Sequence, residues 1–152
     1  MKVPFFSKRD FFSAQEKQKI VNAIRDAEQQ TSGEIRVYVE SHCRFVDPLL
    51  RAEEVFRMLK MNQTAARNGV LVYVAIKDKQ LALYGDLGIH EKVGDDYWRD
   101  KTSRIISNMR SGPYAEAISK IVIEIGEALK LHFPFDRGTD KNELPDDIVY
   151  GR

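Results

Sequence analysis

"VLVYVAI" (residues 70–76) is the longest uninterrupted apolar run in the chain. A short apolar run bounded by turn residues is typical of a strand that helices cover on both faces, as in an α/β sheet. Asn68-Gly69 breaks the chain before this run, and "KDKQ" (residues 77–80) turns it toward a second apolar segment, "LALY" (residues 81–84). We therefore predict a hairpin whose first strand, Val70–Ile76, lies at the centre of the sheet.

The preceding part of the chain predicts helix, strand and helix in turn. Ser13 has capping-box spacing to the next glutamate, which indicates a helix start. Alternation in "EIRVYVES" predicts a strand over Ile35–Glu40, and Asp47-Pro48 is typical of another helix start. Because a helix joins the strands at residues 35–40 and 70–76, they should run parallel, and the strand at 81–84 antiparallel to its neighbour.

Two further helices are expected after residue 96, the second between Pro113 and Pro134. The resulting order of elements predicts an α/β fold, a three-layer α/β/α sandwich with a small mixed sheet. We expect a single domain over residues 1–135 and an extended C-terminal tail over residues 136–152, which has no sustained periodicity.

Composition indicates an ordinary globular protein and points to no special partner. Lysine and arginine number 24 against 23 for aspartate and glutamate, so nucleic acid is not expected as a partner. The lone Cys43 excludes an internal disulfide and fits a reducing compartment. No apolar run reaches membrane-spanning length and the start has no signal-peptide pattern. We expect a soluble, cytoplasmic monomer, with an unknown protein partner possible.

Oxygen-bearing side chains are placed where the predicted topology brings strand ends to one edge of the sheet. These residues are Glu34, Asn68, Asp86, Asp95 and Asp96. Together they would form an oxygen-rich set suited to a hard divalent cation, Ca²⁺ or Mg²⁺. The alternative is that Asp95 caps a helix and that the other acids are solvated residues at element ends. The spacing alone leaves both interpretations open.

The stretch "LYGDLGIHEKVGDDYW" (residues 83–98) could also be taken for a phosphate-binding loop. It has Gly85 and Gly88 but lacks the glycine pattern and the Gly-Lys-Ser/Thr ending of such loops. Its aspartates would also lie where phosphate oxygens bind. We therefore exclude a nucleotide cradle, and we retain His90, which lies within the stretch, as a candidate site residue.

"TSGEIRVYV" (residues 31–39), "RNGVLVYVAIKDKQLALYGDLGIHEKVG" (67–94) and "ISKIVIEIGEALKLHFP" (118–134) together resemble the TPM domain family over about residues 10 to 134. The resemblance implies an α/β/α sandwich and a divalent-cation site, usually calcium, at the sheet edge. It implies phosphatase activity for some members only.

The family's site pattern carries over to this chain with two departures. Glu34, Asn68 and Gly69 match its strand-start motifs, and Asp95 is similar to the aspartate that opens the helix after the glycine loop. Arg67 stands where members often have an acid, which removes a ligand and adds a positive charge. The glycine loop is also one residue longer. Further candidates at this edge are therefore Arg67, Gly69, Gly85, Gly88 and His90.

Two classes of function follow from these residues. The first is a calcium-binding accessory or interaction module. The second is a weak metal-dependent acid phosphatase, in which Arg67 would bind phosphoryl oxygens and His90 would act as general acid. We favour the module, because no activated nucleophile is identifiable and a calcium-type site generates hydroxide poorly compared with zinc.

Overall fold

A computed structural model describes residues 11–45, 47–135 and 148–151. Within these residues the chain forms five α-helices, a short 3₁₀-helix and four strands. In chain order the elements are α2 (Ala14–Glu28), β1 (Glu34–Glu40), α3 (Pro48–Met58), η1 (Met61–Gln63), β2 (Gly69–Ala75), β3 (Gln80–Gly85), α4 (Leu87–Val93), α5 (Asp95–Ser111), α6 (Tyr114–His132) and β4 (Ile148–Tyr150).

The four strands make one mixed sheet in the order β3-β2-β1-β4. β2 runs parallel to β1 and antiparallel to β3, which confirms both predicted pairings. The sheet differs from the expected three strands because β4 adds a parallel edge strand beside β1. β4 comes from the segment that we expected to be a tail, and its three residues are too few to show a period. Residues 136–147 of that segment lie outside the described residues.

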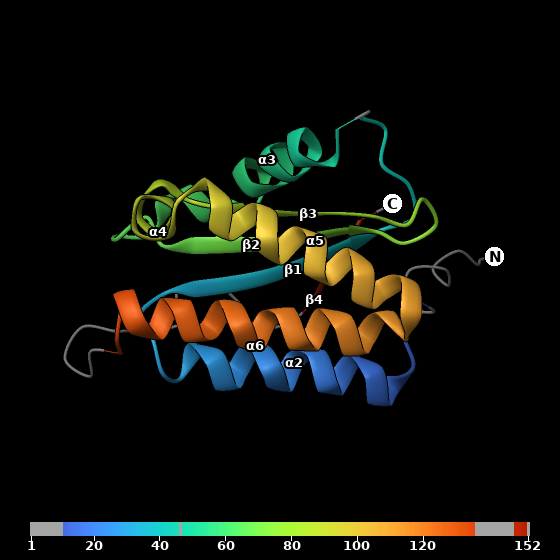
Figure 1. Cartoon of the computed structure of the whole chain (residues 1–152), viewed down its shortest axis with the longest axis horizontal. Coiled ribbons are helices and arrows are strands. Elements are labelled where there is room, and N and C mark those ends of the chain that lie inside the picture. The colour runs from blue at the N-terminus through green and yellow to red at the C-terminus, as the bar shows by residue number, and fades with distance from the viewer. Residues whose placement is uncertain (1–10, 46, 136–147, 152) are drawn as a thin grey trace.

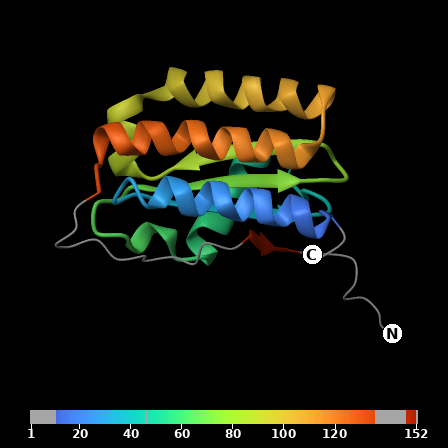
Figure 2. The ribbon, with the colours of Figure 1, turned by 90° about the horizontal axis from the view of Figure 1, so that it is seen from below.

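Helices cover both faces of the sheet in three layers (Figure 1). α3 packs on one face, against Leu71 and Tyr73, while α2 and α6 lie side by side on the other (Figures 1 and 2). The alternation of β1 sends Ile35 and Val37 into the larger core with α2 and α6. Every residue of β2 is buried, as predicted for a strand with helices on both faces. The α/β/α sandwich is thus confirmed.

Helix α4 is an element that the sequence pattern did not predict. Its N-cap is Asp86, whose side chain accepts a hydrogen bond from the Leu87 N–H at 2.8 Å, and Gly94 ends it with a φ of 80°. α4 has seven residues and only Ile89 is buried, so it shows no apolar periodicity. Contacts with the chain before β2 position it: the Gly88 N–H donates to the Arg67 carbonyl at 2.8 Å.

The topology gives the sheet two distinct edges. At the amino edge, β1 and β2 begin and β3 ends; at the carboxyl edge, β1, β2 and β4 end and β3 begins. The register places Glu34 opposite Gly69 and Gly85 opposite Val70 at the amino edge. Over the ranges that the structure describes, no helix combines the length and apolar character needed to cross a membrane.

Candidate functional site

The amino edge brings together the backbone positions at which the sequence placed its candidate residues. The Glu34 N–H donates to the Asn68 carbonyl at 3.3 Å, and the Asp86 N–H donates to the Gly69 carbonyl at 2.9 Å. Three distant segments therefore meet, because parallel strands start at the same edge and the hairpin returns there. The side chains of these segments, however, take separate partners.

Arg67 and Asp86 form a bidentate ion pair at this edge. The Arg67 Nε and Nη2 groups donate to the two Asp86 carboxylate oxygens, each at 2.7 Å. The Asp86 side chain is 4% exposed and that of Arg67 is 47% exposed, so the guanidinium shields the carboxylate from water. Hydrogen bonding to Asp86 raises the pKa of Arg67. Arg67 has a left-handed backbone with φ 53°, which is uncommon outside glycine. The sequence did not reveal this pairing, since Arg67 was considered there as a lost metal ligand and as a phosphoryl-binding group, and not as the partner of Asp86.

His90 is held between Trp98 and Asp95. The Trp98 indole N–H donates to His90 Nδ1 at 3.1 Å, and His90 Nε2 lies 3.3 Å from an Asp95 carboxylate oxygen. Because the indole can only donate, Nδ1 accepts and the imidazole proton of the neutral ring lies on Nε2, facing Asp95. Trp98 packs tightly over the end of β3: a Cβ added at Gly85 would lie 2.2 Å from its ring.

The remaining candidates differ in exposure and in hydrogen-bond partners. Asp96 is exposed and pairs with Arg99 within α5. Asn68 is buried and its Nδ2 donates to Ser32 Oγ at 3.3 Å, whereas its Oδ1 has no hydrogen-bond partner among the described residues. Glu34 is buried at the start of β1. The sequence is right that Asp95 opens α5, but it does not reveal which side chains meet.

These residues, as arranged, do not fit a calcium ion. Calcium takes about six to eight oxygen ligands. Asp86 is engaged by Arg67 and Asp95 faces His90, while Asn68 Oδ1 is a buried oxygen with no partner among the described residues. Within the described parts of the chain, no group of three or more His, Cys, Asp or Glu side chains could hold a metal ion. The charge that a cation would supply next to Asp86 comes from Arg67.

A groove of about 540 Å³ lies beside the Arg67–Asp86 pair. Its walls come from the start of α3, the end of β3, α4 and the start of α5. Two leucines at this groove are unusually open to water, Leu49 at 45% and Leu87 at 54% exposed. The lining residues are Leu49, Arg67, Leu83, Tyr84, Gly85, Asp86, Leu87, His90, Asp95, Trp98 and Arg99. The groove thus combines apolar walls with two guanidinium groups.

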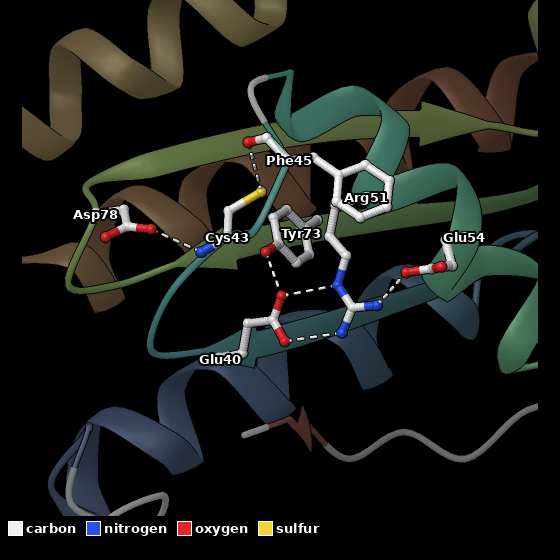
Figure 3. Close-up of polar contacts among 7 residues, drawn as sticks. All are labelled: Glu40, Cys43, Phe45, Arg51, Glu54, Tyr73 and Asp78. Carbon is white, nitrogen blue, oxygen red and sulfur yellow. Dashed lines mark hydrogen bonds and ion pairs between the residues drawn. The ribbon is translucent and has the colours of Figure 1, made fainter.

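A second polar cluster, absent from the sequence-based analysis, lies at the carboxyl edge (Figure 3). Buried Glu40, at the end of β1, accepts hydrogen bonds from Arg51 Nε and Nη2, each at 2.9 Å, and from the Tyr73 hydroxyl. Arg51 comes from α3 and also binds Glu54 one turn later. Burial, and then the hydrogen bond to Glu40, raises the pKa of Tyr73. The sequence carries little signal of this cluster, because a terminal glutamate on an alternating strand is usually exposed.

Comparison with known proteins agrees with the architecture. The structure is similar to the NMR structure of BA42 from the psychrophilic bacterium Bizionia argentinensis, with 42% identity, a TM-score of 0.84, and coverage of 93% of this chain and 97% of BA42. It shares its fold with the N-terminal domain of cg2496 from Corynebacterium glutamicum, at 16% identity, a TM-score of 0.60 and 85% coverage of each chain.

No curated protein gives a significant match to the sequence. The model of the TPM domain matches residues 6–128, which is most of the chain. This chain therefore belongs to the TPM domain family.

Proposed function

We propose that this chain is a non-catalytic interaction module of the TPM domain family, and that its amino-edge groove binds an apolar segment of a partner protein. The observation that carries the proposal is the exposure of Leu49 and Leu87 at a groove of about 540 Å³. Leu50, the next residue of α3, is also 53% exposed but does not line the groove. Exposed apolar side chains at a groove with a polar rim are typical of protein-binding sites.

The charges at the groove define the chemistry of the expected segment. Arg67 is half exposed even while it binds Asp86, and Arg99 extends into solvent. Arginine beside apolar and aromatic surface is enriched at protein interfaces and recognises carboxylates with two parallel hydrogen bonds. We therefore expect a segment with two or more apolar side chains next to an aspartate or glutamate.

Acid phosphatase activity is the alternative function, but the groove offers few of the groups that phosphate hydrolysis requires. Hydrolysis requires a nucleophile or a metal-bound hydroxide near the phosphoryl group. The described residues that line the groove include no Ser, Thr or Cys, and the Asp86 carboxylate is held by Arg67. We expect no metal-dependent turnover of an aryl phosphate above that of the Asp86→Asn variant. Turnover that is lost in that variant, with the fold retained, would favour the phosphatase.

Calcium, in this proposal, is a weak competitor of Arg67 and not a resident cofactor. A divalent cation and the guanidinium would share the same Asp86 oxygens, so one excludes the other. We expect affinities no tighter than those of weak extracellular calcium modules, about 10⁻⁴ to 10⁻³ M.

A random peptide library displayed on phage tests the interaction module directly. Selection on the wild-type protein should enrich peptides in which apolar residues flank an acid. Leu87→Glu should weaken binding of a selected peptide at least about tenfold, because burying a new charge in an apolar contact is costly. Ile123→Glu is the matched control, since Ile123 is 51% exposed on α6 and does not line the groove.

The site at which the selected peptides bind distinguishes the groove from other surfaces of the protein. The proposal is supported if a selected peptide shifts the amide NMR signals of Leu49, Leu87 and Trp98 of the protein. Peptides that bind the Leu87→Glu variant as well as the wild type, or a selection that yields no consensus, would overturn it.

A further inference from the structure

A second cavity lies at the opposite edge of the sheet from the groove. It encloses about 630 Å³ beyond the ends of β1 and β4, and residues 42–45 and the first turns of α3 complete its wall. Ligands of open α/β sheets bind in crevices outside the carboxyl ends of the strands, and the volume falls in the usual range for small-molecule sites. The position and the size of this cavity are therefore those of a ligand site.

The wall of the cavity contains a preorganised guanidinium. Arg51 is fixed from two sides, because Glu40 binds its Nε and Nη2 groups and Glu54 binds its Nη1 group (Figure 3). Tyr73 also donates to Glu40 and so fixes the carboxylate that orients Arg51. A buried ion pair stabilises a fold little compared with apolar residues of the same volume. What the arrangement does provide is an arginine held in one orientation at the cavity.

The cavity has unused hydrogen-bond donors on two arginines. Glu40 and Glu54 accept three hydrogen bonds from Arg51, and a guanidinium carries more N–H donors than these. Arg44, at the same cavity, is exposed and has no ion-pair partner among the described residues. Glu40 is buried and binds both Arg51 and Tyr73, whereas half-exposed Glu54 binds Arg51 through one oxygen. Unused donors on two arginines favour an anionic group on the ligand.

Aromatic rings form the apolar part of the lining. Tyr38, Phe45 and Tyr150 reach the cavity from β1, the β1–α3 connection and β4. Tyr38 is held in place, with the Arg51 guanidinium 5.9 Å from its ring centroid and the Tyr73 ring stacked on it at 6.2 Å. Fixed aromatic side chains bind planar rings by offset or edge-to-face contact.

We propose that this cavity binds a small organic anion that carries a planar ring. Arg44 and Arg51 hold the anionic group, and the aromatic lining holds the ring. A mononucleotide and an aromatic carboxylate share this chemistry. The site is independent of the proposed interaction groove, since the two cavities lie at opposite edges of the sheet and share no lining residue.

NMR titration of the full chain with 5′-AMP and, separately, with phenylacetate tests the proposal. Amides of residues 38–45 and 150–151 should shift with one or both anions at about 10 mM or less, the upper limit for a weak site. A response to AMP alone identifies a nucleotide site, and a response to phenylacetate alone identifies an aromatic-acid site. Adenosine has the ring without the anionic group, and inorganic phosphate has the anionic group without the ring. Each should therefore bind at least about tenfold more weakly than AMP.

Variants separate the cavity from non-specific anion binding. Arg44→Gln should weaken binding of the responding anion about tenfold, since a charge-assisted hydrogen bond is lost, while the exposed position keeps the fold intact. Arg99→Gln, at the opposite edge, is the matched control and should leave the affinity unchanged. Phe45→Leu should weaken binding about two- to tenfold by loss of ring contact.

Three results would overturn the proposal. The first is the absence of amide shifts at residues 38–45 with either anion. The second is inorganic phosphate binding as tightly as AMP with no response to phenylacetate, because the ring would then play no part. The third is an equal loss of affinity in the Arg44→Gln and Arg99→Gln variants.

Discussion

Arg67 is the residue that most strongly determines what the amino edge can bind. Its left-handed backbone and bidentate contact with Asp86 place a positive charge at a point where five oxygen-bearing residues were expected to converge. Buried carboxylates require a partner, since an uncompensated buried charge is costly. In this chain the Arg67 guanidinium is the partner of the Asp86 carboxylate, in place of a bound cation.

Replacement of Arg67 should make the amino edge responsive to calcium. We expect Arg67→Gln to lower the melting temperature, because buried Asp86 loses its partner. Added Ca²⁺ at about 5 mM should then raise the melting temperature of the variant more than that of the wild type, since a ligand of the native state stabilises it by mass action. Thermal unfolding by circular dichroism measures both effects. The double variant Arg67→Gln/Asp86→Asn is the control, and a calcium response that persists in it would show that Asp86 is not the site.

Tyr97 has a buried hydroxyl group whose raised pKa should make the stability of the protein depend on pH. Burial, followed by the negative charges of Glu124 and Glu127, raises its pKa to about 12, against about 10 in an unfolded chain. Its hydroxyl is buried without a hydrogen-bond partner among the described residues. Between these two pKa values the unfolded chain releases the proton before the folded one, so the free energy of unfolding should fall as pH rises from about 10 to about 12.

Substitution of Tyr97 by phenylalanine tests this assignment. Tyr97→Phe should leave the free energy of unfolding unchanged or raise it at neutral pH, since the hydroxyl makes no bond that the change would break and its burial costs free energy. The variant should also lose less stability than the wild type above pH of about 10. Urea unfolding at neutral and alkaline pH gives the comparison. Parallel alkaline losses in the two proteins would refute the role of Tyr97.

At the scale of elements, α4 shows how a short helix is formed by its neighbours. Isolated helices of this length are unstable in water, and only Asp86 provides a side-chain cap. Gly88 allows the helix to lie against the backbone before β2, where a Cβ would meet the Ala66 carbonyl oxygen at 2.2 Å and that of Arg67 at 2.7 Å. The close approach positions Leu87 and His90 beside the groove.

Gly88→Ala should therefore destabilise the protein although alanine is the better helix former. Helix propensity favours alanine by about 1 kcal/mol, but backbone oxygens cannot move aside as side chains do, and overpacking costs about 1–3 kcal/mol. We expect a net loss of about 1 kcal/mol or more in urea unfolding. Gly112→Ala is the matched control: a Cβ there has its nearest neighbour at 3.8 Å, so its effect should stay within about 0.5 kcal/mol. Equal effects of the two substitutions would contradict the packing explanation.

For the whole molecule, the order of the strands predicts a gradient of stability across the sheet. β1 and β2 are central and pair on both sides, whereas β4 is an edge strand of three residues. Amide protons exchange most slowly where opening requires global unfolding. Native-state hydrogen exchange should show the slowest amides in β1 and β2 and much faster ones in β4. Protection of β4 amides equal to that of β2 would contradict this gradient.

The sequence by itself determined the layers of the protein and the directions of its first three strands. The apolar run at residues 70–76, bounded by turn residues, predicted a strand that is buried on both faces, and β2 is buried along its whole length. The capping box of Ser13 and the Asp47-Pro48 pair located helix starts that the structure confirms. The amino edge was predictable for the same reason: strand directions follow from the connections, and they bring residues 34, 68 and 86 to one place.

Only the tertiary structure decided which side chains meet there and at the opposite edge. Arg67 and Asp86 are 19 residues apart and pair because the end of β3 lies beside the chain before β2 in the folded protein. Glu40 and Arg51 belong to elements whose local patterns suggest exposed polar positions, and packing of α3 on the sheet buries their contact. β4 is too short to carry a period, so its place beside β1 depends on pairing alone. Local patterns determine elements and directions, whereas side-chain partners depend on distances across the folded chain.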